Sequence, residues 1–171
     1  MTRPEPAEYA PHHRLYLDLV AGDDLLITLP AQSAKTLAFW RGITEEEACL
    51  RPAEDRWSWK QVLNHLNDTE RIFSYRTLRF ARGDQQSLPG FEQDDYALQA
   101  DADRLPWADL VKEYAAIRQA SLALFRSLRP EDYTRSGIAS GHPTSARAFA
   151  YMVAGHELHH LKILGRDYLR I

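Results

Sequence analysis

Apolar residues recur at helical spacing in four segments of the chain, and no segment shows the strict alternation that predicts a β-strand. The clearest segment runs from Ser58 to about Arg82. The others start near Asp23 or Asp24, run from Trp107 to about Leu128, and run from Thr144 or Ser145 to about Tyr168. Four helices of about 15 to 25 residues each predict an all-α fold, an up-down-type four-helix bundle.

Capping residues set the expected helix ends. Ser58 is a candidate N-cap and Gly83 a candidate terminator of the clearest helix. Pro30 falls within the first apolar stripe, so that helix is either kinked at Pro30 or begins there. Between the second and third helices lies a long connection, Asp84 to Pro106, with a short helical piece expected around Gln93 to Ala100.

Length and composition indicate one domain with a full core, since 44% of the 171 residues are hydrophobic. We expect residues 1–22, which contain Pro4, Pro6 and Pro11, to form an irregular or loosely attached arm, and residues 23–171 to form the helical domain. The net charge of −3 and the lack of a basic cluster argue against nucleic acid as a partner. Without a signal-like segment or a long apolar run, we expect a cytoplasmic protein that does not bind membranes.

Two histidines one helical turn apart, His156 and His160, indicate a metal site. On a helix, positions i and i+4 share a face, so two imidazole nitrogens can meet one ion. His65 lies on the inward face of the second helix and is the candidate third ligand, which would leave an open position for catalysis. If the last helix is rotated, His156 and His159 form the competing pair. Hydrogen-bonded core histidines without a metal remain the alternative.

Other polar residues receive simpler interpretations. Asp68 follows His65 by one turn and could accept a hydrogen bond from an imidazole or from metal-bound water. His12 and His13 are expected to be a solvated pair, and His142 a turn residue. Glu70 and Glu157 are expected to be surface or capping charges, and Cys49, which follows an acidic run, a small apolar residue rather than a nucleophile.

Two blocks of sequence resemble the DinB/YfiT-like family of metal-dependent enzymes. One is Trp57-Ser-Trp-Lys-Gln-Val-Leu-Asn-His65-Leu-Asn-Asp68-Thr-Glu-Arg71, followed by Arg76, by Ala81-Arg-Gly-Asp84 and by Leu88-Pro-Gly-Phe91. The other is Gly155-His156-Glu-Leu-His-His160-Leu. The likeness runs from about Asp24 to Tyr168.

This resemblance implies a four-helix bundle, commonly a homodimer, with a divalent ion held by His65, His156 and His160. It also implies either thiol S-transfer, which joins a low-molecular-weight thiol to an electrophile, or hydrolysis. Leu158 and Leu161 lie far from the inward face of the last helix, so an exposed apolar strip there would suit a dimer.

The chemistry of such a site favours thiol S-transfer on small electrophiles, in stress or detoxification. The chain has no well-placed cysteine nucleophile, and a thiol cosubstrate bound to a divalent ion becomes a thiolate. Asp68 is the candidate general base, and Arg76 the candidate that binds a substrate carboxylate. Zinc is the expected ion, while nickel, cobalt or iron would suit the same nitrogens. A metal-dependent hydrolase and a non-catalytic metal-binding bundle are the alternatives.

Overall fold

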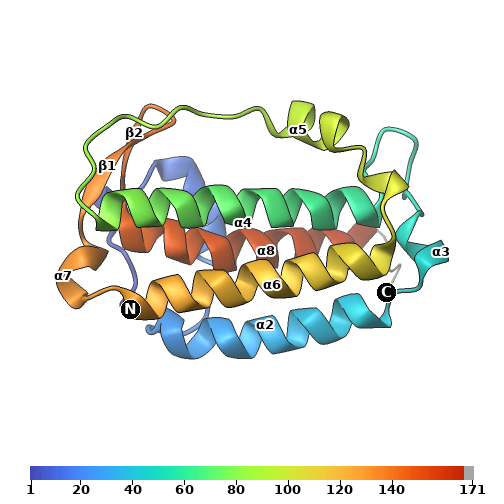
Figure 1. Ribbon diagram of the computed structural model, residues 1–171, viewed down its shortest axis with the longest axis horizontal. Helices are drawn as coiled ribbons and strands as arrows, with labels where there is room; N and C mark the ends of the chain where they lie inside the picture. The colour runs from blue at the N-terminus through green and yellow to red at the C-terminus, as the bar shows by residue number, and fades with distance from the viewer. Residues whose placement is uncertain (168–171) are drawn as a thin grey trace.

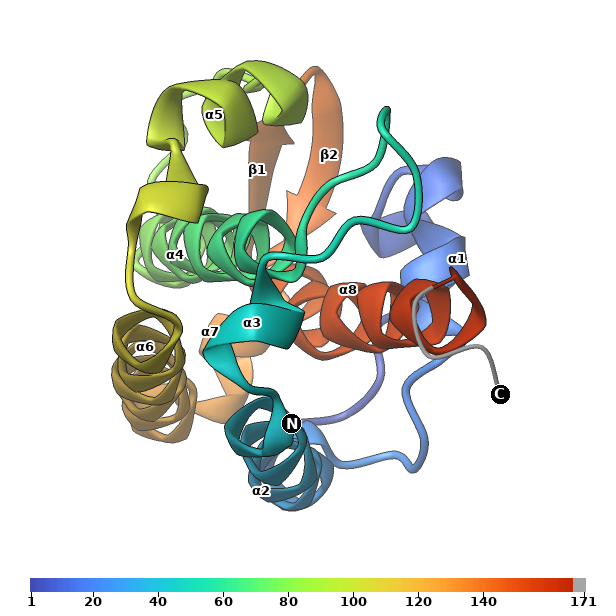
Figure 2. The ribbon, with the colours of Figure 1, turned by 90° about the vertical axis from the view of Figure 1, so that its right-hand side faces the viewer.

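The computed structural model describes residues 1–167, in which four long helices lie side by side as a bundle (Figures 1 and 2). They are α2 (Leu25–Gly42), α4 (Trp59–Ala81), α6 (Trp107–Ser127) and α8 (Ala146–Asp167). Helix α4 packs against both α6 and α8, and α2 packs against the same two helices from the other side. The predicted all-α four-helix bundle is confirmed.

Helix α4 begins and ends as its capping residues predict. The Ser58 side chain accepts a hydrogen bond from the backbone N–H of Gln61. The Gln61 side chain in turn accepts one from the backbone N–H of Ser58. This reciprocal capping box satisfies two N–H groups that the helix itself leaves free. Gly83 follows the helix with a φ of 79°, a conformation that glycine adopts without steric cost.

Helix α2 begins at Leu25, with Asp24 as its N-cap. The Asp24 carboxylate accepts hydrogen bonds from the backbone N–H of Leu26, at 3.0 Å, and from the N-terminal amino group of Met1, at 2.7 Å. The helix continues through Pro30, so the alternative that it begins at that proline is wrong.

The long connection between α4 and α6 returns along the length of the bundle, so these two helices run in the same direction (Figure 1). The up-down order expected for the bundle is therefore wrong at this connection, because consecutive helices in such an order are antiparallel. It contains α5 (Gln93–Ala100), where the short helical piece was predicted, and the 3-10 turn η3 (Ala102–Arg104). Two single-turn helices, α3 (Glu45–Ala48) and α7 (Pro130–Tyr133), lie in the other connections.

A small β-hairpin, which the sequence analysis did not predict, precedes α8. Strands β1 (Ser136–Ala139) and β2 (His142–Ser145) pair antiparallel around a two-residue turn. Ser140 and Gly141 have φ angles of 51° and 79°, as a tight hairpin turn requires. Leu88 adds backbone bonds to Ile138 and Ser140, so the long connection is tied to the hairpin. The sequences of these strands, Ser136-Gly-Ile-Ala and His142-Pro-Thr-Ser, show no alternation of apolar and polar residues.

The N-terminal arm is packed against the bundle and is not loosely attached. It contains the 3-10 turns η1 (Pro6–Glu8) and η2 (Pro11–His13) and the short helix α1 (Arg14–Leu17), which contacts α8. Leu17 is buried in the main core. Gly155 in α8 allows the close approach, because a Cβ atom there would lie 2.2 Å from the backbone oxygen of Tyr16. The prolines predicted irregular backbone correctly, but they carry no information about packing on residues far along the chain.

The apolar strip that suggested a dimer is not free. Leu158 and Leu161 are half-buried, and each packs against one of the two core clusters. The homodimer therefore stays a prediction without this support.

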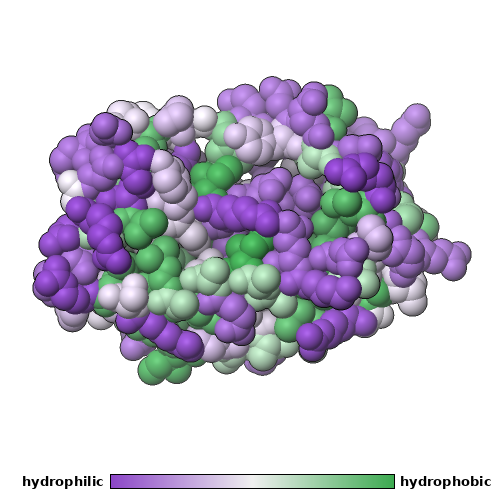
Figure 3. Space-filling model, in the orientation of Figure 1, coloured by the Kyte–Doolittle hydropathy of each residue, from purple (hydrophilic) through white to green (hydrophobic). Residues whose placement is uncertain are grey.

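On the face formed by α4 and α6, a groove is lined by Tyr75, Leu78 and Leu124 among others, and apolar areas alternate with polar ones there (Figure 3). Across the described residues, no helix combines the length and apolar character needed to span a bilayer.

Candidate metal centre

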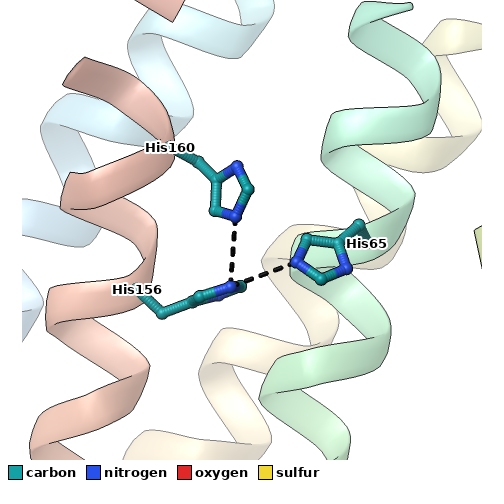
Figure 4. Close-up of side chains that lie close together, drawn as sticks. All are labelled: His65, His156 and His160. Atoms are coloured by element: carbon teal, nitrogen blue, oxygen red, sulfur yellow. Dashed lines mark hydrogen bonds between the residues drawn. The ribbon is translucent and has the colours of Figure 1, made fainter. Parts of the chain in front are cut away.

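Three histidines from two helices converge in the bundle (Figure 4). His156 and His160 project from one face of α8, and His65 projects toward them from α4. The Nε2 atom of His156 lies 3.1 Å from Nε2 of His65 and 3.1 Å from Nε2 of His160. The predicted pairing of the second and fourth long helices brings these rings together. His159 lies outside this cluster, with its ring edge-on to Tyr16.

The environment keeps all three rings neutral. Burial lowers the pKa of His65 to about 4 and that of His160 to about 3. The pKa of His156 also lies well below its ordinary value, because the ring is buried and has the other two histidines beside it. Neutral imidazole is the form that binds a metal ion, so no proton must leave at pH 7.

Hydrogen bonds alone cannot satisfy the three nitrogens, and their spacing is close to that of the ligands of a divalent ion. A ring nitrogen has one lone pair or one hydrogen, so Nε2 of His156 can form only one good hydrogen bond, yet it has two partners at 3.1 Å. Ligand nitrogens about 2.0–2.1 Å from a tetrahedral zinc ion lie about 3.3–3.4 Å apart. All three ligand atoms lie within 4.8 Å of one another.

A cleft of about 410 Å³ lies beside the three-histidine cluster. Helices α4 and α8, the N-terminal arm, the long connection and the hairpin each contribute to its wall; the lining residues are His12, His13, Tyr16, His65, Thr69, Phe73, Arg76, Phe91, Glu92, Gln93, Ser140, His142 and His156. His12 and His142 are exposed at this cleft, whereas His13 is half-buried in its wall, so the expectation of a solvated pair is wrong for His13 alone. His142 directly follows the hairpin turn, as expected, and also lines the cleft. No local signal could place them here, because the arm and the hairpin meet only in the folded protein.

Asp68 is not among the residues that line this cleft. Its carboxylate accepts hydrogen bonds from Asn64, at 3.0 Å, and from Arg71, at 3.4 Å. Burial raises the pKa of this carboxyl, and the neighbouring Glu113 raises it further. Thr69 lines the cleft one turn after His65. The role of Asp68 as a general base stays a prediction, and these contacts do not favour it.

Arg76 lies in the cleft wall with the histidines, as its inward position on α4 predicted. Its Nη2 atom donates to the backbone oxygen of Pro89, at 2.7 Å, and to Oγ of Ser140, at 3.2 Å. Burial lowers the pKa of its guanidinium. Whether it binds a substrate stays a prediction.

Glu70 and Glu157 are buried, so the expectation that they are surface charges is wrong. Arg118 of α6 donates to Glu70 at 2.9 Å and to Glu157 at 2.6 Å. Glu157 also accepts hydrogen bonds from Tyr114 and Thr36, at 2.6 and 2.9 Å. This ionic network lies next to His156. A small cavity of about 10 Å³ is lined by His156 together with Glu70, Arg118 and Glu157. It anchors α8 against α6 and α2 at the level of the three-histidine cluster.

Comparison with known proteins agrees with this arrangement. The model of the DinB superfamily matches residues 29–164. An Oceanobacillus iheyensis protein named "Putative metal-dependent hydrolase OB0413" is 28% identical over 122 residues, which cover 70% of this chain and 69% of that protein. The fold is similar to that of YfiT from Bacillus subtilis, described as "a probable metal-dependent hydrolase with an unusual four-helix bundle topology". That match has a TM-score of 0.64 and 14% identity, and covers 95% of this chain and 91% of the other.

Proposed function

The chain belongs to the DinB superfamily, and from this membership and the three-histidine cluster we propose that it is a metal-dependent enzyme acting on small electrophiles. His65, His156 and His160 would hold one divalent ion, with zinc as the expected metal. The observation that carries this proposal is the convergence of three neutral Nε2 atoms, two from buried rings and one from the half-buried His160, that cannot all satisfy one another by hydrogen bonds.

We further propose that the reaction is S-transfer from a low-molecular-weight thiol. A divalent ion in this site would polarise an electrophile and would lower the pKa of a thiol or water bound to it. A thiol bound to the ion would release its proton to water, because the only carboxylate in the described cleft lining is the exposed Glu92. The single cysteine, Cys49, is exposed and is not part of the lining.

The protein's residues have three tasks in this proposal. The paired helices α4 and α8 hold the three imidazoles at fixed separation, so little reorganisation is needed on binding. The rings of Tyr16 and Phe73 lie edge-on to His156, at 5.3 and 6.0 Å between centroids, and shield that ring from water. The cleft leaves one side of the cluster open to a small substrate.

Hydrolysis is the second candidate, and the name of the Oceanobacillus iheyensis relative favours it. The same site would serve it with water as the nucleophile. The two reactions differ in one requirement, since S-transfer needs an added thiol and hydrolysis does not.

The proposal is tested with protein purified without an affinity tag. Its metal content is measured by elemental analysis, and turnover of an alkylating or arylating electrophile is followed with and without a small thiol. A panel of activated esters is assayed in parallel. We expect thiol-dependent turnover that chelation abolishes and the lost metal restores. Thiol-independent, metal-dependent ester cleavage would support hydrolysis instead.

His65→Ala and His159→Ala form a matched pair of variants. His65→Ala removes one of three ligands, so we expect loss of metal and of turnover together. His159→Ala removes a neighbouring histidine of the same helix that contributes no ligand atom to the cluster and only meets the His160 ring edge-on, so metal content should stay at the wild-type level. A His65→Ala protein that retains a full equivalent of metal would contradict the assignment of the site.

A further inference from the structure

Arg76 is a buried cation without an acidic partner. The residue is only 6% exposed, and its two hydrogen-bond acceptors, the Pro89 carbonyl and the Ser140 hydroxyl, are uncharged. The rings of Phe91 and Phe149 lie 5.9 and 5.4 Å from its guanidinium carbon. Among the side chains of residues 1–165, no carboxylate forms an ion pair with it. A buried, unpaired charge is costly, so this position favours an anion supplied from outside the chain.

The charge of the cleft suits a single carboxylate. Arg76 is the only lysine or arginine in its described lining, and Glu92, at the exposed rim, is the only acidic residue. His13 adds no charge at pH 7, because burial, helped by the nearby His12, His142 and Arg76, lowers its pKa to about 4. One permanent positive charge matches a monoanion better than a dianionic phosphate, and a guanidinium can bind a carboxylate through two parallel hydrogen bonds.

The distance between Arg76 and the three-histidine cluster requires an extended ligand. Arg76 follows His65 by eleven positions on α4, about 16 Å along the helix axis and within about 20° of the same face. Thr69 and Phe73 lie between them and line the same cleft. Arginine side chains in a helix lean toward its N-terminus, so the guanidinium approaches His65 and shortens the span.

A polar group is also available midway along this wall. Thr69 is only 3% exposed, and its hydroxyl has no hydrogen-bond partner among the described residues. A buried hydroxyl without a partner is unfavourable, so an oxygen of a bound ligand would relieve that cost. The opposite wall is a row of rings, in which His156 meets Tyr16, Tyr16 meets His13, and His13 meets His12.

We propose that the cleft binds an extended small molecule that carries a carboxylate, with the carboxylate at Arg76 and the reactive end at His65, His156 and His160. The proposal rests on the proposed function for the identity of the reactive end. It specifies the class of substrate on which that site would act.

Calorimetric titration with linear carboxylates tests the proposal without turnover. The protein as purified, with its metal content measured, is titrated with dicarboxylates from succinate to sebacate and with octanoate. A diacid can reach both the metal end and Arg76, whereas octanoate can supply only one charge. We expect suberate or sebacate to bind about tenfold to hundredfold more tightly than octanoate, as a charge-assisted hydrogen bond provides.

Variants test whether Arg76 is the source of the tighter binding of suberate. Arg76→Gln should bind suberate and octanoate alike, and Arg76→Lys should retain part of the preference because it keeps the charge. Arg126→Gln, which removes an exposed arginine of α6 outside the cleft, should behave as wild type. Circular dichroism and metal content confirm that each variant is folded and loaded.

Three results would overturn the proposal: equal affinities of wild type for suberate and octanoate, no binding of either, or an unchanged preference in Arg76→Gln. These results are independent of catalysis. If no thiol or ester is turned over, the proposed function fails while the carboxylate preference can still be read from the titrations.

Discussion

The substitution Gly155→Ala has two opposing effects on the free energy of unfolding, and the contacts of Gly155 determine which is larger. Alanine is favoured over glycine inside a helix by about 1 kcal/mol, so α8 considered alone would gain stability. A Cβ atom at this position, however, would lie 2.2 Å from the Tyr16 carbonyl oxygen and 2.5 Å from its carbonyl carbon. These are backbone atoms, which cannot rotate away, so α1 must move outward from α8.

We expect the clash to dominate. Overpacking a well-packed contact costs about 1–3 kcal/mol, and this contact, where backbone must move, belongs at the upper end. After subtracting the gain in helix propensity, the free energy of unfolding should fall by about 1–2 kcal/mol. Displacement of α1 would also move Tyr16 away from His156, whose ring it meets at 5.3 Å.

Urea denaturation followed by circular dichroism measures this effect as a shift of the midpoint at constant slope. Gly165→Ala is the matched control, because the same substitution in the same helix meets no atom within 4 Å. It should be neutral or stabilise the protein by up to about 1 kcal/mol. If Gly155→Ala is as stable as Gly165→Ala, the arm does not pack on α8 as described.

Three further predictions follow from buried polar groups. Arg118→Met strands the carboxylates of Glu70 and Glu157, and should lower the free energy of unfolding by about 3–5 kcal/mol in urea titrations; a loss below about 1 kcal/mol would mean that the network is solvated. In metal-free protein the pKa of His65 is lowered to about 4, so on acidification this histidine is protonated in the unfolded chain before it is protonated in the folded one. About 3 kcal/mol of stability that is present above pH 6.5 should therefore be lost as the pH falls to about 4. Melting curves across this range that show no such loss, or the same loss in His65→Gln, would exclude it. Thr69→Val removes an unpartnered buried hydroxyl and should stabilise the protein by about 1 kcal/mol, whereas a destabilised variant would reveal a partner for that hydroxyl.

Local features of the sequence account for the parts of the fold and site that were predicted correctly. The cap at Ser58 and the one-turn spacing of His156 and His160 depend only on residues a few positions apart, and helix geometry converts that spacing into a shared face. The prediction that His65 points into the bundle is confirmed, because the face of α4 that carries it packs against α8.

The same helical projection misplaced Glu70 and Glu157, because it assumes that each helix has one buried face. Helix α4 is covered by α6 as well as by α8, and α8 contacts α1, α2 and α4. A residue that points away from one neighbour therefore points into another. The short-range pattern contains no information on how many neighbours a helix will have.

By itself, the sequence determined the helical class, most helix ends and the residues able to bind a metal, since all of these follow from interactions within a few turns of one helix. Only the tertiary structure decided the surroundings of the three-histidine cluster. The arm with His12 and His13, the hairpin with Ser140 and His142, and Arg76 meet across the whole length of the chain. Their meeting depends on packing contacts such as that of Gly155 with the arm, and such contacts leave no periodic signal in the order of residues.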